Sequence, residues 1–256
     1  MINFSWDMVL LLLAAGFASG FIDALVGGGG LISLPAFLIV GLSPGLALGT
    51  NKFSATCGII MSSFTFYRSG KVDKELLKRI MPASFAASAF GAYVVMQIPP
   101  LYLKPIIVVL LAAVLLFVVF KKDWGSVEAP RERTFKQLVL AFLFAAAMGL
   151  YDGFIGPGTG TFLIFGLIFM GFNFVNAAGN AKCMNMASNI GGLLIFMLYG
   201  NVDYIYGGLM AVSTFIGAYF GAKLAILKGS QFVRWVFIVM TSVMIGKLIW
   251  DYLQTW

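Results

Sequence analysis

Long apolar stretches, separated by short polar ones, follow one another along the whole chain. Each carries few or no charges and is close to the 17–25 residues that a helix needs to cross a bilayer. They lie near residues 8–26, 44–67, 80–97, 101–120, 137–155, 175–199, 204–222 and 232–250. The pattern predicts a membrane-spanning helix for each, so the expected fold class is an all-α polytopic membrane protein with about 8 spans.

Two shorter apolar segments, 31–41 and 161–171, bring the hydrophobic segments to ten. Each supplies about 11 residues, or roughly 16 Å of helix, which is half of the ~30 Å hydrocarbon core. Such a segment is too short to span the membrane upright. It is expected either to form a re-entrant hairpin with the preceding helix or to cross at a tilt.

The composition agrees with a membrane protein. Of the 256 residues, 61% are hydrophobic and 11% are charged, against roughly 45–50% and 25% in soluble domains.

Residues 1–30 contain Asp7 and Asp23 but no Lys or Arg, so a cleavable signal peptide is not expected. Cys57 and Cys183 fall inside apolar runs, where packing is expected instead of a disulfide. The net charge is +7, but the basic residues lie mainly in short loops between the spans, as membrane orientation requires. Nucleic acid is therefore not an expected partner.

The second half of the chain repeats the first at an offset of about 130 residues. Lys52 recurs as Lys182, and Asp23 recurs as Asp152. Further matches pair Gly41, Ala47, Gly49, Phe66 and Gly91 with Gly171, Ala177, Gly179, Phe196 and Gly221. Internal duplication is common in secondary transporters. It predicts two homologous membrane repeats, 1–120 and 137–256, joined by a polar linker, 121–136.

Loop charges predict that the two repeats are inverted. The loop 68–79 is rich in Lys and Arg, whereas the equivalent loop of the second half, "GNVDY" (200–204), has neither. The next loop, 223–234, is basic again. By the positive-inside rule, 68–79, the linker and 223–234 face the cytoplasm, and both termini lie outside. Each repeat then crosses the membrane an odd number of times, which inverts the second relative to the first.

Both repeats contain a glycine-broken helix just before the short segment, as "DALVGGGG" (23–30) and "DGFIGPGTG" (152–160). Glycine costs roughly 1 kcal/mol in a helix interior and proline about 3, so paired breaks favour a function. A break supplies free N–H groups and a positive helix end, which suit an anion. The alternative is close helix packing on small residues. The candidate substrate-binding glycines are Gly27, Gly28, Gly29, Gly30, Gly156, Gly158 and Gly160.

One lysine in each repeat is predicted to lie near the middle of the membrane. Pro44 suits the first helical position, which places Lys52 about 12 Å into the helix; Lys182 occupies the matching place. A charge at the bilayer centre costs at least about 2.5–3.5 kcal/mol, so such residues nearly always face a cavity or each other. Snorkelling to the membrane surface is the alternative. Polar neighbours that would complete a site are Asn51, Thr56, Asn185 and Asn189.

These parts suggest a carrier for a small anion. The anion would sit near the midplane, held by Lys52, Lys182 and the N–H groups of the breaks. Asp23 and Asp152 would balance the lysines in the empty site or carry a coupling proton or Na⁺, with a structural salt bridge as the alternative. Rocking of one repeat against the other would alternate access. An anion-selective channel would use the same lysines and is the main rival.

An enzyme is not expected. The chain has two aspartates in apolar segments, Asp23 and Asp152. Intramembrane aspartyl proteases also have two, and their carboxylates hold one proton between them. The Gly-x-Gly-Asp motif of those enzymes is missing, and midspan lysines would disturb such a pair. The chain has no His, so no clustered zinc site is indicated, and no cofactor is expected.

Four ordered motifs resemble the TauE/SafE sulfite exporter family, which includes 4-toluene sulfonate uptake permeases. They are "GGGGLISLPAFL", "GLSPGLALGTNKFSA", "GLYDGFIGPGTG" and "NAAGNAKCMNMASNIGGL". The resemblance covers nearly the whole chain. It implies a carrier of the bacterial inner membrane with a sulfur-containing anion, such as sulfite or an organosulfonate, as substrate; the termini, placed outside by the loop charges, would then be periplasmic. The second break is "GPGTG" and not a plain glycine run, so the half-sites need not contribute equally. A homo-oligomer is left open.

Overall fold

The computed structural model describes residues 6–99, 101–103, 106, 109 and 134–254. The first half contains α1 (Trp6–Val26), α2 (Gly30–Ile39), α3 (Pro44–Arg68) and α4 (Lys74–Met96). The second contains α6 (Phe135–Phe154), α7 (Thr159–Phe169), α8 (Phe174–Leu198) and α9 (Tyr204–Gln254). The predicted span 101–120 and linker 121–136 lie mostly outside the described residues.

The two halves have the same succession of long and short helices. The short helices α2 and α7 have 10 and 11 residues, and the helices that follow them, α3 and α8, have 25 each. Among the described residues, five helices are long and apolar enough to cross a membrane: α1, α4, α6, α8 and the Tyr204–Val233 part of α9. The chain is a polytopic membrane protein.

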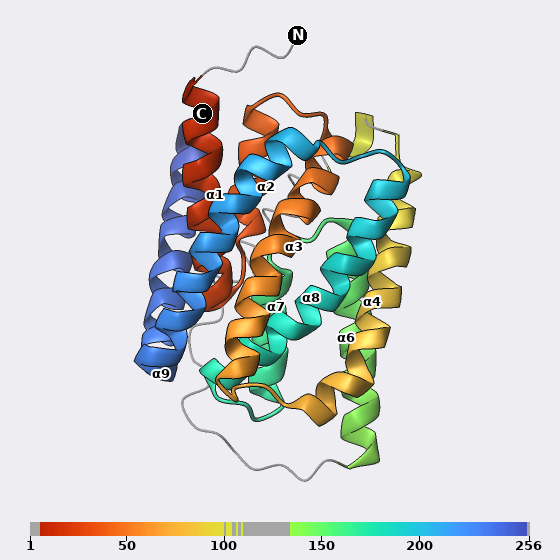
Figure 1. Cartoon of the computed structure of the whole chain (residues 1–256), viewed down its shortest axis with the longest axis vertical. Coiled ribbons are helices and arrows are strands. Elements are labelled where there is room, and N and C mark those ends of the chain that lie inside the picture. Colours follow the sequence, from red (N-terminus) through yellow and green to blue (C-terminus); the bar gives the residue numbers. More distant parts are fainter. Residues whose placement is uncertain (1–5, 100, 104–105, 107–108, 110–133, 255–256) are drawn as a thin grey trace.

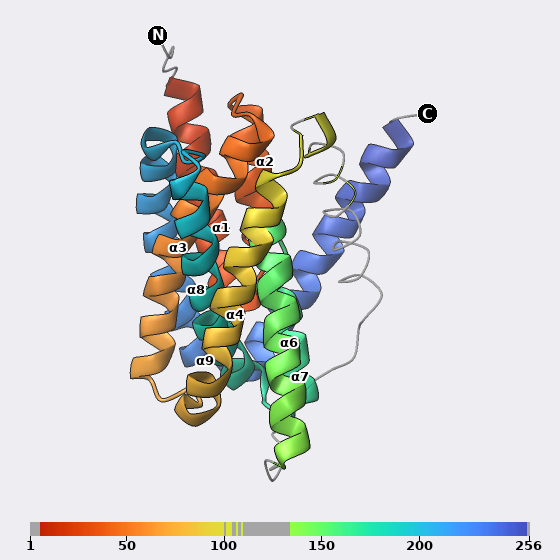
Figure 2. The ribbon, with the colours of Figure 1, turned by 90° about the vertical axis from the view of Figure 1, so that its right-hand side faces the viewer.

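The α9 helix consists of two legs. Gly229 interrupts it with φ 76° and ψ −173°, a conformation outside the helical region, and Figures 1 and 2 show the chain reversing direction near the lower end of the molecule. The predicted spans 204–222 and 232–250 are therefore separate legs on either side of this kink.

The short helices form hairpins with the helices that precede them. In Figures 1 and 2, α1 starts at the upper end and the α2–α3 connection lies at that same end, whereas α6 starts and α7 finishes at the lower end. With 10 residues, α2 extends only about 15 Å. Of the two paths open to the short segments, the structure therefore has the re-entrant hairpin.

Equivalent loops of the two halves lie at opposite ends of the molecule (Figures 1 and 2). The α3–α4 loop, which contains Lys71, is at the lower end, and the α8–α9 loop, around Asn201, is at the upper end. The start of α1 and the end of α9 also lie toward the upper end. The start of α6, which follows the linker, lies at the lower end with the basic loop.

The halves interleave, because the first helix of each packs along the last long helix of the other: α1 lies against α9, and α6 lies against α4. A Cβ at Gly20 of α1 would collide with the Thr214 backbone, and one at Gly149 of α6 would collide with the Ser84 backbone. Glycine lets these backbones touch. Two mixed bundles result, bundle 1 (α1, α2, α3 and α9) and bundle 2 (α4, α6, α7 and α8), which meet mainly where α3 contacts α8.

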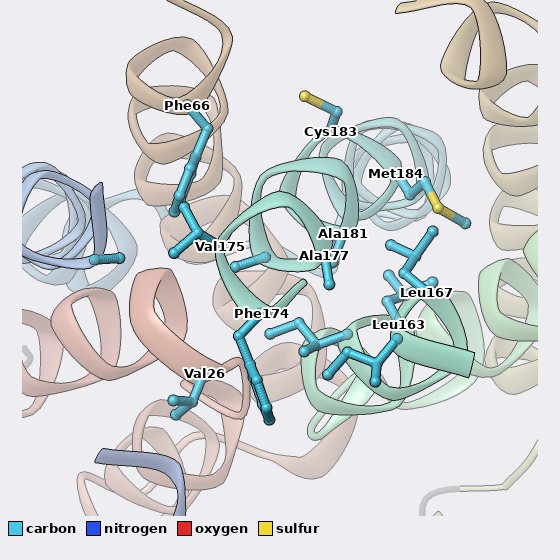
Figure 3. Packing of buried hydrophobic residues seen from close by; sticks show 14 of the residues in the cluster. Val26, Phe66, Leu163, Leu167, Phe174, Val175, Ala177, Ala181, Cys183 and Met184 are labelled. Atoms are coloured by element: carbon cyan, nitrogen blue, oxygen red, sulfur yellow. The ribbon is translucent and has the colours of Figure 1, made fainter. Parts of the chain in front are cut away.

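The hydrophobic core surrounds the short helices. Figure 3 shows Leu163 and Leu167 of α7 facing Ala177 and Ala181 of α8, and all four side chains are fully buried. In bundle 1, Leu34 and Phe37 of α2 are enclosed in the same way. Non-helical backbone survives at membrane depth only where protein or a water-filled cavity covers it. This packing therefore shelters both glycine breaks. Cys57 and Cys183 are free thiols, as expected.

Candidate functional site

Two ion pairs connect the halves of the chain. Lys52 Nζ of α3 lies 2.7 Å from Asp152 Oδ2 of α6, and Lys182 Nζ of α8 lies 2.8 Å from Asp23 Oδ2 of α1. Each lysine thus pairs with the aspartate of the opposite half, and each pair joins bundle 1 to bundle 2. The ammonium groups are buried beside carboxylates and do not extend toward the membrane surface, which is the usual arrangement for charges in a low-dielectric interior.

The glycine breaks place the aspartates. At the first break, Gly27 and Gly28 have φ of 79° and 85°, a region that glycine adopts without steric cost. The Gly27 N–H donates to the Asp23 backbone carbonyl over 2.9 Å. The chain then turns so that the Gly29 N–H, at the start of α2, donates to Asp23 Oδ1 over 3.2 Å. The Asp23 carboxylate, which belongs to α1, therefore lies at the N-terminus of α2, where an anion is favoured.

The second break makes room for the lysines. A Cβ added at Gly156 would lie 3.1 Å from Lys52 Nζ, and one at Gly160 would lie 3.2 Å from Lys182 Nζ. Both distances are shorter than ordinary van der Waals contact. Glycine at these positions therefore lets each ammonium group approach the backbone closely.

The glycine breaks of the two halves are in contact with each other. A Cβ on Gly27 would collide with the backbone of Gly160 and Thr161, and the Thr161 hydroxyl donates to the Val26 carbonyl over 3.2 Å. Pro157 packs over Gly30, where an added Cβ would lie 3.0 Å from the Pro157 Cα. Gly27 is thus a packing glycine between the halves.

The two ion pairs differ in their surroundings. The Lys182 and Asp23 side chains are 0% and 18% exposed, whereas Lys52 and Asp152 are 4% and 3% exposed. Asp152 Oδ2 also accepts a hydrogen bond from Asn189 Nδ2 over 3.1 Å. Asp152 is therefore held by two side-chain donors in a closed environment, and Asp23 is the more accessible carboxylate.

A cavity of about 30 Å³ lies between these groups, enough for about two water molecules. It brings together the sequence-predicted site residues except Gly27, Thr56 and Lys182: the lining includes Asp23, Gly28, Gly29, Gly30, Asn51, Lys52, Asp152, Gly156, Gly158, Gly160, Asn185 and Asn189. Lys182 is fully buried and does not line the cavity. The half-sites are therefore unequal, with Lys52 at the cavity wall.

Several predicted groups already have partners within the protein. The Gly156 N–H donates to the Tyr151 carbonyl over 3.3 Å, in addition to the bonds of Gly27 and Gly29. Asn51 Oδ1 accepts from the Ser33 hydroxyl over 2.6 Å. The Thr56 hydroxyl donates to the Lys52 carbonyl over 2.6 Å, so it serves its own helix and does not line the cavity. The expectation of free N–H groups at the breaks thus differs from the structure, because a carboxylate and carbonyls take up three of them.

Two cavity-lining hydroxyl residues, Ser19 of α1 and Thr214 of α9, were missed by reasoning from the sequence. Neither is charged and neither belongs to a break. The sequence does contain a signal for close packing, because Gly16 and Gly20 have the four-residue spacing of small residues in packed membrane helices. That spacing does not say which helix packs there, so it could not bring Thr214 to the site.

Comparison with known proteins agrees with this architecture. Residues 12–248 match the family model described as "Sulfite exporter TauE/SafE". A "Probable membrane transporter protein" of Haemophilus influenzae is 34% identical over 251 residues, which are 98% of this chain and 97% of that protein. The "Probable membrane transporter protein YfcA" of Escherichia coli strain K12 is 36% identical over 234 residues, 91% of this chain and 86% of that protein.

A more distant relative, the "Probable membrane transporter protein YdhB" of Bacillus subtilis, is 27% identical over 223 residues, 84% of this chain and 88% of that protein. No solved structure matches the chain. The family model covers both glycine breaks and both midspan lysines, and the relatives match along nearly their whole lengths. The chain therefore belongs to the sulfite exporter TauE/SafE family, a family of membrane transporters and not of enzymes.

Proposed function

We propose that this protein is a secondary transporter that carries a small sulfur-containing oxyanion or organosulfonate across the bacterial inner membrane by alternating access. The observation that supports it best is the cavity where both glycine breaks, the Lys52 ammonium group and two aspartates meet. The four charges of the two ion pairs cancel, so the empty site is neutral. Membership of a family described as sulfite exporters supports the substrate class.

In the empty site, the Asp23 carboxylate occupies the position that suits an anion. It accepts hydrogen bonds from the Gly29 N–H at the start of α2 and from the Lys182 ammonium group. These are donors that a sulfonate or sulfite would also use, because charge-assisted hydrogen bonds to oxyanions are strong. We therefore propose that the substrate competes with Asp23 for these donors.

This competition suggests how transport is coupled. Adding a monovalent anion, such as hydrogen sulfite or a monosulfonate, to a neutral buried site leaves one uncompensated negative charge, which is costly in a low-dielectric interior. A proton on Asp23 would restore neutrality and release the Gly29 N–H and Lys182 for the substrate. Asp23 is the more accessible carboxylate, so we assign it the coupling role and assign Asp152 the role of counter-ion to Lys52. Na⁺ beside Asp23 is the alternative coupling ion.

The proposed moving parts are the mixed bundles. The inverted arrangement is supported by the opposite positions of equivalent loops. Rocking of residues 1–120 against 137–256 would separate α1 from α9 and α6 from α4, although the backbones of these helix pairs are in contact. Movement of bundle 1 against bundle 2 keeps those contacts and changes mainly the α3–α8 interface, the contact between the two glycine breaks and the two ion pairs. The cavity of about 30 Å³ must enlarge in this movement, because sulfite is larger than two waters.

The orientation follows from the basic residues. The α3–α4 loop, which contains Lys71, lies toward the lower end in Figure 1, and so does the kink of α9 within the basic segment 223–234. This end is therefore proposed to face the cytoplasm, as the positive-inside rule requires. The linker 121–136 is then cytoplasmic and both termini are periplasmic.

The test is flux in proteoliposomes. Purified protein is reconstituted, and uptake of radiolabelled sulfite and sulfoacetate is measured with thiosulfate, taurine and chloride as competitors. We expect saturable uptake, acceleration by unlabelled substrate on the opposite side, and loss of both in Lys52→Met. Lys78→Ala is the matched control, because Lys78 is an exposed lysine that pairs with Glu75 on its own helix. Uptake without saturation or acceleration would identify an anion channel, and absence of any anion flux would contradict the proposal.

A further inference from the structure

The Thr214 hydroxyl group stands out at the cavity wall. Thr214 is 4% exposed and lines the cavity, yet its Oγ1 has no hydrogen-bond partner among the described residues. A hydroxyl can both donate and accept hydrogen bonds, and buried polar groups nearly always have a partner. A buried hydroxyl of this kind, beside a cavity, indicates a ligand that is supplied from outside the protein.

Packing on two sides holds Thr214 in place. A Cβ at Gly58 of α3 would lie 2.6 Å from Thr214 Cγ2, and one at Gly20 of α1 would collide with the Thr214 backbone. The threonine is therefore wedged between two helices of bundle 1. Because the methyl group is directed against Gly58, its position restricts the side-chain rotamer and with it the direction of the hydroxyl.

The neighbouring hydroxyl and the equivalent position in the other half are both satisfied. The Ser19 hydroxyl donates to the Gly29 carbonyl over 2.9 Å. At the offset of 130, the residue that matches Thr214 is Ser84 of α4, which is buried away from the cavity and whose hydroxyl donates to the Met184 carbonyl over 3.4 Å. The fold thus satisfies the hydroxyl at this position in the first half, and in the second half it leaves the Thr214 hydroxyl without a partner among the described residues, beside the cavity.

We propose that the Thr214 hydroxyl is a direct ligand of the transported anion and donates a hydrogen bond to one of its oxygen atoms. This inference rests on the proposed function, and it extends the site to a helix outside the glycine breaks and lysines. A sulfite or sulfonate group has three oxygen atoms, which accept hydrogen bonds from several donors at once. Thr214 then contributes to the selection of oxyanions.

The experiment measures the dissociation constants of sulfite and sulfoacetate by calorimetry on purified protein in nanodiscs. Thr214→Val replaces the hydroxyl with a methyl group of similar size. We expect it to raise Kd about tenfold or more, because a hydrogen bond to a charged group is lost. Thr214→Ser keeps the hydroxyl and should stay within about threefold of wild type. Ser63→Ala is the matched control: Ser63 is also a buried hydroxyl residue of a spanning segment, but it does not line the cavity.

Melting without ligand separates binding from folding. The Thr214 hydroxyl makes no hydrogen bond within the described part of the protein, so Thr214→Val should melt at or above the wild-type temperature. If that variant does not fold, Thr214→Ala against Thr214→Ser makes the same comparison, with weak binding expected for alanine only. Equal Kd values for wild type and a folded variant without the hydroxyl would overturn the assignment of Thr214 and leave the proposed function standing. Absence of sulfite and sulfoacetate binding by the wild type would overturn both.

Discussion

The ammonium group of Lys52 lies 2.7 Å from the carboxylate of Asp152, 100 residues further along the chain and on a helix of the other bundle. The same relationship links Lys182 to Asp23. Both pairs lie between bundles that otherwise meet mainly through α3 and α8. Movement of one bundle against the other would therefore change the only charged contacts described between them, and we propose these pairs as the link between substrate, coupling ion and conformation.

Removing one member of the Lys52–Asp152 pair should destabilise the protein. Lys52→Met leaves the Asp152 carboxylate buried with Asn189 alone, and breaking a buried pair costs about 3–5 kcal/mol. We expect a clear fall in Tm in detergent. The double variant Lys52→Met with Asp152→Leu removes both charges and should recover most of the stability without recovering transport. A double variant no more stable than the single one would show that the pair is not the source of the loss.

Asp23→Asn tests the coupling role. The change keeps the shape of the side chain but removes the charge that faces Lys182 and the Gly29 N–H. We expect anion exchange to continue, while sulfite-driven proton movement, measured with a pH-sensitive dye inside proteoliposomes, disappears. Asp152→Asn should instead impair binding, because Lys52 loses its counter-ion. Proton movement that survives in Asp23→Asn would exclude Asp23 as the proton carrier, and a requirement for Na⁺ gradients would indicate the other coupling ion.

The glycine breaks can be tested with two glycines of similar conformation. Gly27 has φ 79° and Gly41 has φ 90°, so alanine at either position carries the left-handed strain of about 1–2 kcal/mol. Only at Gly27 would the new methyl group also collide with backbone, that of Gly160 and Thr161; Gly41 has open space. Gly27→Ala should therefore lower Tm much more than Gly41→Ala. Equal effects in a melting experiment would mean that the two breaks do not pack against each other.

The interleaving of the halves can be tested in the same way. Gly20→Leu places a side chain against the Thr214 backbone, so it should force α1 away from α9 and destabilise the protein strongly. Gly208→Leu is the control on α9, because nothing lies within 4 Å of its Cβ position; it should be neutral or slightly stabilising, since leucine is a better helix former than glycine. Similar melting temperatures for the two variants would contradict the contact between α1 and α9.

Much of the architecture could be predicted because it depends on local pattern. Apolar run length predicts the spans and marks 31–41 and 161–171 as too short to span upright; of the hairpin and the tilted crossing that this left open, α2 and α7 form hairpins. The spacing of Lys52 from Pro44, and the glycines beside Asp23 and Asp152, marked where polar groups would lie in an apolar setting. In hydrocarbon such groups need a partner or a cavity, so composition alone indicated that they would be brought together.

Tertiary structure alone decided the partners. The repeat places each lysine equally well beside the aspartate of its own half or of the other, and only the packing of α1 on α9 and of α6 on α4 assigns Lys52 to Asp152 and Lys182 to Asp23. The same packing withdraws Lys182 and Gly27 from the cavity and brings Thr214 to it. The sequence by itself determined which groups must leave the lipid, because burial of polar groups is set by composition and spacing. The structure determined which groups meet, because contacts between residues far apart in the chain depend on how close the backbones can approach.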